Sequence, residues 1–504
     1  MSKRGSIPRV DQARIRAWAC VGAALLLSLG LKPNQALADD AGAVKSVFRA
    51  GAFASNITPP LGLPIVGNFN QPKATHVHDE LHARCLVLDD GTRKLAFAIC
   101  DSVGIPREVF DEAKKRAHEA TGIPVEYMLT AATHSHSATA AGGHKPSASG
   151  EMEWTAYQKL LIRRIADGIR QANENLAPAQ IGWGSADVPT QVFNRRWHMK
   201  EGTRLPKPYG GVDKVKMNPS RGSASLVKPA GPTDPQVSFL SLRTTSGQPI
   251  AFLGNYSLHY VGGVSEGHIS ADYFAVFADR MQQHLKADRL EPPFVGIMSN
   301  GTSGDVNNIN FKVPSPAKKP YEKMREVADE VADAVFKANQ SIKFHDWVPL
   351  DAAQRELKLA TRKPTPEQHK RALEVVALPE SAKLELPHER AYAQRLVALH
   401  NGPDEVSVIL QSFRIGDLGI AAIPFEVFTE SGLAIKEKSP FQPSFTIELA
   451  NGSNGYLPTP RQHELGGYET WMGTNRVEVQ ASEKIVATLL DLFKDLKSRS
   501  TSAH

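Results

Sequence analysis

Residues 85–100 read CLVLDDGTRKLAFAIC. Two apolar stretches flank a polar turn near Asp90-Gly91, which is the pattern of a β-hairpin. Residues 107–122, REVFDEAKKRAHEATG, follow with helical spacing and a terminal glycine. Residues 125–133, VEYMLTAAT, then return to the apolar pattern of a strand. This succession of hairpin, helix and strand predicts an α/β fold in which antiparallel strand pairs dominate.

The same alternation continues along the rest of the chain. Helical patterns cover 157–176, 272–286, 321–339, 365–400 and 483–496, and strand patterns cover 237–245, 249–259, 294–300, 408–416 and 418–425. Residues 195–236 are rich in Gly, Pro, Lys and Ser, and we expect an irregular surface segment there. No Pro/Ser-rich linker divides the chain. We therefore expect one large domain of mixed, largely antiparallel β-sheets packed with flanking helices.

The N-terminal residues have the features of an export signal. Five basic residues lie within residues 1–16, an apolar run covers 17–31, and Ala36-Leu37-Ala38 precedes Asp39. This order predicts a secretory signal peptide, cleaved after Ala38, and a secreted or periplasmic protein of residues 39–504. The alternative, an N-terminal membrane anchor, is disfavoured because the run is shorter than about 18 apolar residues.

Charge and cysteine content exclude some classes of protein. Residues 1–38 hold six Lys/Arg and one Asp, so the formal charge of +6 falls to +1 without them. The remaining basic residues are not gathered in one stretch, and we expect no nucleic-acid partner. Cys85 and Cys100 flank the hairpin, where a cross-strand disulfide is geometrically open. Two buried free thiols are the favoured interpretation.

Polar residues that suit a metal follow several apolar strands directly. They are His134 and His136 in ATHSHSATAAGG, His259 in GNYSLHYVGG, Glu426 in AAIPFEVFTESG and Tyr456 in IELANGSNGYLPTP. Zinc binds imidazole nitrogen and carboxylate oxygen. In an extended chain the side chains of His134 and His136 point to opposite sides, so only one of them is expected as a ligand unless the chain turns there. Each residue alone is also compatible with an ordinary core or surface position. The pattern supports a metallohydrolase hypothesis. The sequence contains no G-x-S-x-G motif, which counts against a serine hydrolase of the α/β-hydrolase type.

In this order, these stretches resemble the neutral/alkaline non-lysosomal ceramidase family over roughly residues 50–480. ATHSHSATAAGG resembles the family's THTHSGPGG stretch, and NYSLHYVGG resembles its second histidine stretch. FNRR resembles its NRS stretch, SGDVNNIN its GDVSPN stretch, and IPFEVFTESG its PGEF stretch. YLPTPRQHELGGYE resembles the stretch in which two tyrosines lie twelve residues apart.

The resemblance implies a zinc amidohydrolase that cleaves the N-acyl bond of ceramide. Its implied Zn²⁺ ligands are His134, His259, Glu426 and Tyr456. A lipid or small-molecule amide would then be the substrate, with transient contact with a membrane surface.

The resemblance also implies roles for residues around the ion. His136 would transfer a proton or contact substrate. Arg195 and Tyr468 would stabilise the developing oxyanion, each by about 3 kcal/mol.

The sequence departs from the family pattern at Asn307, which stands where the family has a serine. An amide is no nucleophile but can donate a hydrogen bond, so we expect direct attack by zinc-activated water. We also expect residues 39–504 to form the ceramidase-like zinc hydrolase domain without the family's added immunoglobulin-like domain. Two alternatives stay open: the same fold and zinc site acting on a different amide or ester, or a non-catalytic exported binding protein.

Overall fold

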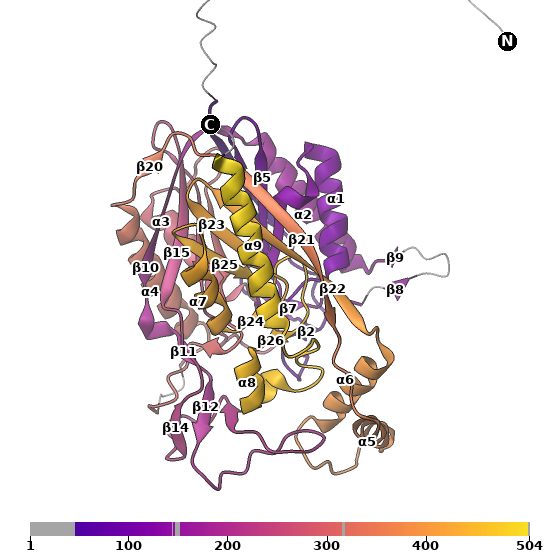
Figure 1. The fold of residues 1–504 in the computed structure, drawn as a ribbon. Helices are drawn as coiled ribbons and strands as arrows, with labels where there is room; N and C mark the ends of the chain where they lie inside the picture. Colours follow the sequence, from indigo (N-terminus) through magenta and orange to yellow (C-terminus); the bar gives the residue numbers. More distant parts are fainter. Residues whose placement is uncertain (1–45, 144, 147–151, 315–317, 502–504) are drawn as a thin grey trace, which may run out of the picture. The chain divides into compact units, whose positions relative to one another are not determined.

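A nine-stranded mixed sheet forms the centre of the protein (Figure 1). The computed structural model describes residues 46–143, 145–146, 152–314 and 318–501. The strand order is β18-β16-β15-β10-β1-β4-β5-β6, and β20 pairs with β10. Only the outermost pairs, β16–β18 and β5–β6, are parallel. The strands are β1 (Arg49–Asn56), β4 (His82–Asp89), β5 (Lys94–Cys100), β6 (Met128–Ala132), β10 (Ala177–Asp187), β15 (Gln236–Thr244), β16 (Pro249–Tyr256), β18 (Val295–Asn300) and β20 (Phe344–His345).

The hairpin predicted at residues 85–100 is β4–β5. Asp90 closes its turn, because its Oδ1 atom accepts hydrogen bonds from the backbone N–H groups of Thr92 and Arg93 at 2.8 and 2.7 Å. Cys85 and Cys100 are buried free thiols on these strands, as expected. Helices α1 (Arg107–Thr121) and α2 (Ala156–Glu174) pack on the face that carries both thiols.

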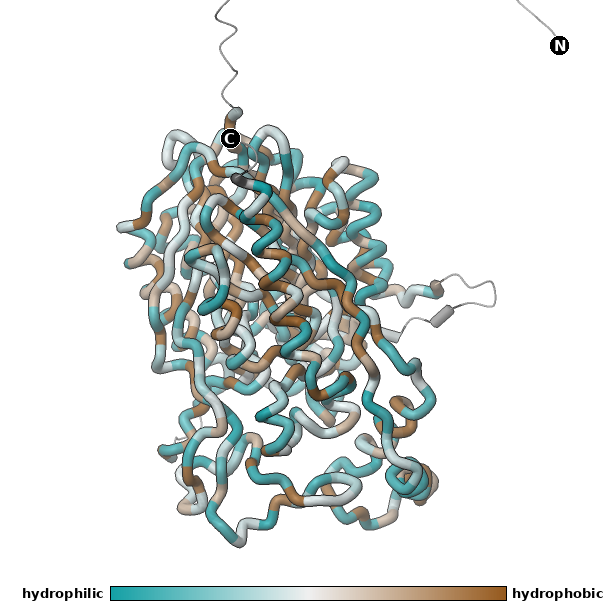
Figure 2. The backbone as a smooth tube through the Cα atoms, in the orientation of Figure 1, coloured by the Kyte–Doolittle hydropathy of each residue, from teal (hydrophilic) through white to brown (hydrophobic). Residues whose placement is uncertain are grey.

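A second, four-stranded sheet packs on the other face of the hairpin. Its order is β21 (Leu350–Ala360), β22 (Glu405–Ile415), β23 (Leu418–Ile423) and β25 (Ser444–Glu448). The rings of Phe97 and Phe413 meet between the two sheets with centroids 5.4 Å apart. Helices α7 (Thr429–Lys438) and α9 (Ala481–Thr501) cover the outer face. Figure 2 shows teal and brown alternating along α9, as expected for a helix with one face on a sheet.

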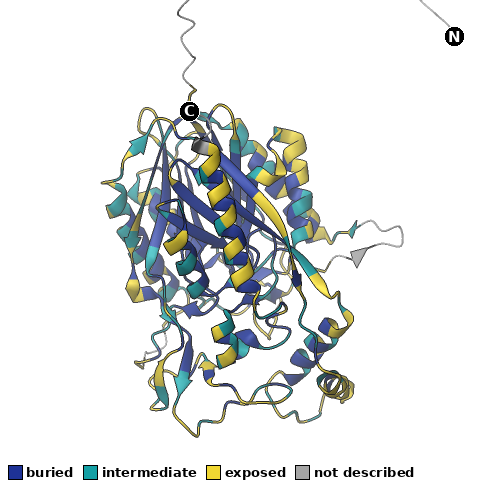
Figure 3. Cartoon of the chain, viewed as in Figure 1, coloured by how far each residue is buried: buried dark blue, intermediate teal, exposed yellow. Residues whose placement is uncertain are grey.

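The remaining helices lie around this pair of sheets. Helices α3 (Asp272–His284) and α4 (Glu322–Asn339) cover β15, β16 and β18, and α5 (Pro366–Ala377) pairs with α6 (Glu389–Asn401) beyond the ends of β21 and β22. Figure 3 shows buried strands between helices that expose their outer faces. Short elements complete the chain: β2 (Ile65–Val66), β3 (His76–Val77), η1 (Val125–Tyr127), β7 (Ala138–Thr139), β8 (Lys145–Pro146), β9 (Met152–Glu153), η2 (Pro189–Gln191), β11 (Phe193–Asn194), β17 (His268–Ile269), β19 (Val306–Asn307), β24 (Glu426–Val427), β26 (Tyr456–Leu457), α8 (Pro460–Leu465) and η3 (Tyr468–Thr470).

The predicted fold class is confirmed, with one correction. The segment 195–236 is not simply irregular, because β12 (Arg196–Met199) pairs with β13 (Val215–Met217) and β14 (Leu226–Pro229). The first residue of β12 explains why this segment is ordered: Arg196 is fully buried, and its guanidinium binds the Glu469 carboxylate at 2.7 Å. A buried ion pair thus fixes a segment whose composition predicts a loop.

Residues 46–504 form one compact unit. The predicted signal peptide, residues 1–38, lies outside the described residues. Among the helices that the structure describes, none is long and apolar enough to cross a membrane.

Candidate metal centre

The predicted metal ligands lie on short segments that follow the ends of strands in both sheets. His134 follows β6, and His259 follows β16, near the opposite edge of the nine-stranded sheet. The ends of the two edge strands, β6 and β18, lie close together: Asn300 at the end of β18 donates a hydrogen bond to the Thr133 carbonyl at 3.4 Å. Glu426 on β24 pairs in register with Tyr456 on β26. The site is therefore assembled from segments far apart in the sequence.

His134 and His136 point to the same place, although extended chain would separate them. The backbone turns at His134, whose φ is +70°, and its N–H donates to the Ser102 carbonyl at 2.8 Å. As a result the Nε2 atoms of the two histidines lie 3.1 Å apart. The His136 ring also stacks on Tyr260, with centroids 3.7 Å apart. The expectation that the two side chains point to opposite sides is wrong, because it assumed extended chain and strand β6 ends at Ala132, before His134.

Three imidazoles and one carboxylate converge. Glu426 Oε2 lies 3.3 Å from His134 Nε2 and 3.8 Å from His259 Nε2. His134, His136 and His259 each offer a ring nitrogen within 4.8 Å of the others. The opposite nitrogens of two rings are already engaged: Nδ1 of His134 lies 2.6 Å from the Val103 carbonyl oxygen, and Nδ1 of His259 lies 3.2 Å from that of Ser303. These contacts direct the Nε2 lone pairs toward Glu426.

This donor set fits a divalent cation such as zinc. Burial, and then the charge of His134, hold the pKa of His259 well below its usual range, so its ring is neutral. Burial raises the pKa of Glu426, but His134, Tyr456 and Arg195 together outweigh it, and the net shift is downward. Within the described residues, Glu426 Oε2 is buried without a hydrogen-bond partner. A buried carboxylate oxygen facing several imidazole nitrogens is the arrangement that a bound cation satisfies.

Two more predicted site residues lie at the rim of this cluster. Arg195 is buried, donates to Glu469 Oε1 at 3.0 Å and to the Gly304 carbonyl at 2.8 Å, and its guanidinium lies 5.3 Å from the Tyr456 ring centroid. Burial alone would lower the pKa of Arg195, but the opposing effect of Tyr456 and Glu469 is larger, and the net shift is upward. The side chain therefore stays cationic. Tyr468 packs edge-on to Tyr456, with centroids 5.9 Å apart. It also lines a cavity of about 240 Å³.

Asn307 occupies a different environment. Its side-chain amide donates to Asn218 Oδ1 at 2.9 Å and accepts from the Ile309 N–H at 3.0 Å. Among the described residues its side chain makes no hydrogen bond to the histidines or to Glu426. Both ends of the amide are therefore engaged by loop residues rather than directed at the cluster.

Sequence reasoning did not assign a role to Ser303 and Glu448. Ser303 Oγ lies 3.3 Å from His259 Nδ1 and donates to Glu448 Oε1 at 2.6 Å. Glu448 Oε2 accepts from the backbone N–H of Val427, beside Glu426, at 2.7 Å. Glu448 is fully buried, so it connects the segments that carry two candidate ligands. The available signal was a lone carboxylate in the apolar strand SFTIE.

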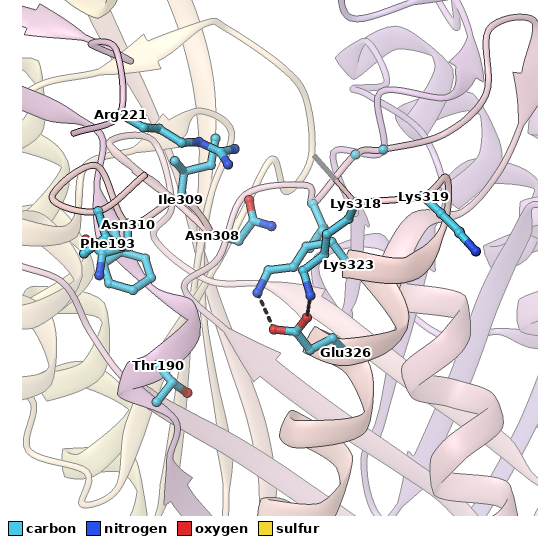
Figure 4. Close-up of a pocket in the computed structure, with 14 residues that line it drawn as sticks. Thr190, Phe193, Arg221, Asn308, Ile309, Asn310, Lys318, Lys319, Lys323 and Glu326 are labelled. Carbon is cyan, nitrogen blue, oxygen red and sulfur yellow. Dashed lines mark hydrogen bonds and ion pairs between the residues drawn. The ribbon is translucent and has the colours of Figure 1, made fainter. Parts of the chain in front are cut away.

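A basic cavity of about 440 Å³ adjoins the segment after His259 (Figure 4). Val261 and Gly262 line it, and so do Lys318 and Lys323. Figure 4 shows both lysines reaching the Glu326 carboxylate, and Lys323 Nζ lies 2.8 Å from it. The two lysines therefore share one carboxylate, which offsets one of their two positive charges.

Comparison with known proteins identifies the fold but does not identify the reaction. No family model matches the chain. The structure is similar to the crystal structure of neutral ceramidase from Pseudomonas aeruginosa, with a TM-score of 0.66 and 19% identity over 90% of this chain and 75% of that one. A ceramidase complexed with C2 gives a TM-score of 0.65 and 17% identity over 90% and 76%. At this identity the likeness shows that the chain has a ceramidase-like fold, with side chains that could bind a metal at its centre.

Proposed function

We propose that this protein is a zinc-dependent amidohydrolase that cleaves an N-acyl amide, with lipid amides such as ceramide as the substrate class. Export follows from the predicted signal peptide, with residues 39–504 as the mature enzyme. The observation that carries the proposal is the convergence of His134, His259 and Glu426 side-chain donors in the buried centre of a ceramidase-like fold. A metal ion would satisfy Glu426 Oε2, which is buried, makes no hydrogen bond among the described residues and lies beside the His134 and His259 imidazoles.

In this proposal His134, His259, Glu426 and Tyr456 hold the ion. A bound zinc ion polarises a carbonyl and lowers the pKa of water toward about 7. Glu426 also contacts the Tyr456 phenol, and this contact lowers the pKa of the carboxylate. The register of β24 with β26 keeps the two side chains adjacent.

The surrounding residues supply the other steps of amide hydrolysis. Arg195 brings a permanent positive charge, and Tyr468 brings a phenol that can donate toward the oxyanion. The fixed contacts of Arg195 with Glu469 and Gly304 orient its guanidinium before substrate arrives. In this proposal His136, whose Nε2 lies 3.1 Å from His134 Nε2, passes a proton to the leaving nitrogen.

The test is the metal content of purified variants. Wild-type protein is expected to hold zinc, and His134→Ala, His259→Ala and Glu426→Gln are expected to lose it. His136→Ala should keep zinc and lose turnover. His400→Ala, an exposed histidine stacked on His369, is the matched control and should behave as wild type.

The substrate is tested with N-acyl sphingosines, simple amides and esters, assayed side by side. Turnover of the N-acyl sphingosine is expected. If His136→Ala also loses zinc, His136 is a ligand and the proposed division of roles is wrong. Zinc-free wild-type protein whose stability does not respond to added zinc would overturn the metalloenzyme proposal. Turnover of esters alone would assign the same site to another substrate.

A further inference from the structure

A separate cavity of about 360 Å³ lies beside the C-terminal half of helix α6. Its walls come from α6, from the ends of β21 and β22, and from the segment around Gly473–Val477. None of the eight predicted site residues lines it. Its volume falls in the range of small-molecule sites. It is therefore a candidate site that is independent of the metal centre.

Two arginines line this cavity without an acidic partner. The Arg476 side chain is solvent-accessible, and among the described residues it has no hydrogen bond or ion pair. Arg395 donates only a long hydrogen bond to Thr474 Oγ1 at 3.4 Å, and its guanidinium lies 5.5 Å from the Phe69 ring centroid. Two positive charges thus share one cavity with no described carboxylate bound to either of them.

The rest of the wall is mostly apolar. Ala398 and Leu399 face the cavity from α6, and Val406 and Val477 line it from the other side. Apolar surface of this kind gains about 25 cal/mol per Å² when a hydrocarbon covers it. The cavity therefore combines a cationic part with a wall suited to an alkyl chain.

We propose that this cavity binds a free fatty acid, with its carboxylate between Arg395 and Arg476 and its alkyl chain along the apolar wall. Guanidinium groups bind carboxylates through paired, charge-assisted hydrogen bonds, which explains why two arginines stand here without an acid of their own. Hydrolysis of a lipid amide releases such an acid. The identity of the ligand as a reaction product rests on the proposed function, whereas the site itself does not.

The cavity also touches the segments that hold Tyr456. Asn454 and Gly473 line it, and the Tyr456 N–H donates to the Thr474 carbonyl at 3.2 Å. Asn475 Nδ2 donates to the Tyr456 carbonyl at 3.0 Å. A bound fatty acid would therefore rest against the backbone that positions a candidate metal ligand, without occupying the metal centre.

The test is calorimetric binding of dodecanoate to the full chain, below the concentration at which dodecanoate aggregates. Arg476→Gln should weaken binding by about tenfold or more, as expected for loss of a charge-assisted hydrogen bond. Ala398→Trp should abolish binding by filling the cavity while keeping both arginines. Arg355→Gln, which removes an exposed arginine on β21, is the matched control and should bind as wild type.

Binding should persist in His134→Ala, even if that variant has lost its metal and all turnover. This arm separates the cavity from the proposed function, because the proposed hydrolase can fail while dodecanoate still binds. Loss of binding in His134→Ala would place the acid at the metal centre and overturn the proposal, and so would wild-type affinity in both Arg476→Gln and Ala398→Trp. Dodecanol should not bind measurably. Equal or tighter binding of dodecyl phosphate would assign the cavity to a phosphate head group instead.

Discussion

Ser303 and Glu448 show how single residues outside the ligand set are expected to tune it. Ser303 Oγ links His259 Nδ1 to the buried Glu448 carboxylate. Removing such a support typically weakens metal affinity by about 10- to 100-fold. We expect Ser303→Ala to weaken zinc binding by about tenfold, measured by competition with a chelator. Ser341→Ala, on an exposed residue outside the site, is the control. Unchanged zinc affinity in Ser303→Ala would show that the Ser303 carbonyl alone orients His259.

Residue chemistry was predictable here, but residue geometry was not. His134, His259 and Glu426 stand out in the sequence because metal-competent side chains follow apolar strands directly. The positive φ of His134 has no local signal, since histidine in that conformation is set by tertiary contacts such as the hydrogen bond to Ser102. The role of Ser303 was also hidden, because its partner Glu448 lies 145 residues further along the chain.

At the scale of elements, Glu469 is expected to hold η3 against β12. Its carboxylate binds Arg196 at 2.7 Å and Arg195 at 3.0 Å, and both guanidinium groups are buried. Breaking a buried ion pair from one side typically costs about 3–5 kcal/mol, because an uncompensated charge stays behind. We expect Glu469→Gln to lower the free energy of unfolding by about 3 kcal/mol in urea titrations. Glu464→Gln, an exposed neighbour, should leave it unchanged.

Helix α1 carries a buried lysine that should make stability depend on pH. Burial lowers the pKa of Lys114 from 10.5 to about 7, and its amine contacts Asn451 Oδ1 at 2.5 Å. The unfolded chain therefore binds more protons than the folded chain between those two values. The free energy of unfolding should rise with pH across that window, by at most about 1.4 kcal/mol per pH unit.

The variant Lys114→Met isolates this effect. Urea titrations at about pH 7 and about pH 10 should show wild type gaining stability relative to Lys114→Met as the pH rises. Lys115→Met, which removes the exposed neighbouring lysine, should follow wild type. Parallel pH profiles for wild type and Lys114→Met would show that the Lys114 amine keeps an ordinary pKa in the folded protein.

At the scale of the whole molecule, local patterns predicted the elements but not how the two sheets meet. Apolar periodicity located the hairpin β4–β5, helix α1 and helix α9 correctly, since each pattern is local. The ends of β6 and β18 approach each other because the nine-stranded sheet is curved. The spacing of residues in the sequence does not predict this curvature. The order in Arg196–Pro229 likewise depends on a carboxylate 273 residues away from Arg196.

This assembly predicts that zinc stabilises the fold as a whole. His134 and His259 follow strands of the nine-stranded sheet, whereas Glu426 and Tyr456 follow strands of the four-stranded sheet, so one ion would join both sheets. Binding to the folded state alone should add about 2.7 kcal/mol at a free zinc concentration about 100 times the dissociation constant. We expect chelation to lower the thermal midpoint of wild type and of His400→Ala, but not that of Glu426→Gln. An equal decrease in Glu426→Gln would mean that the stabilising ion binds elsewhere.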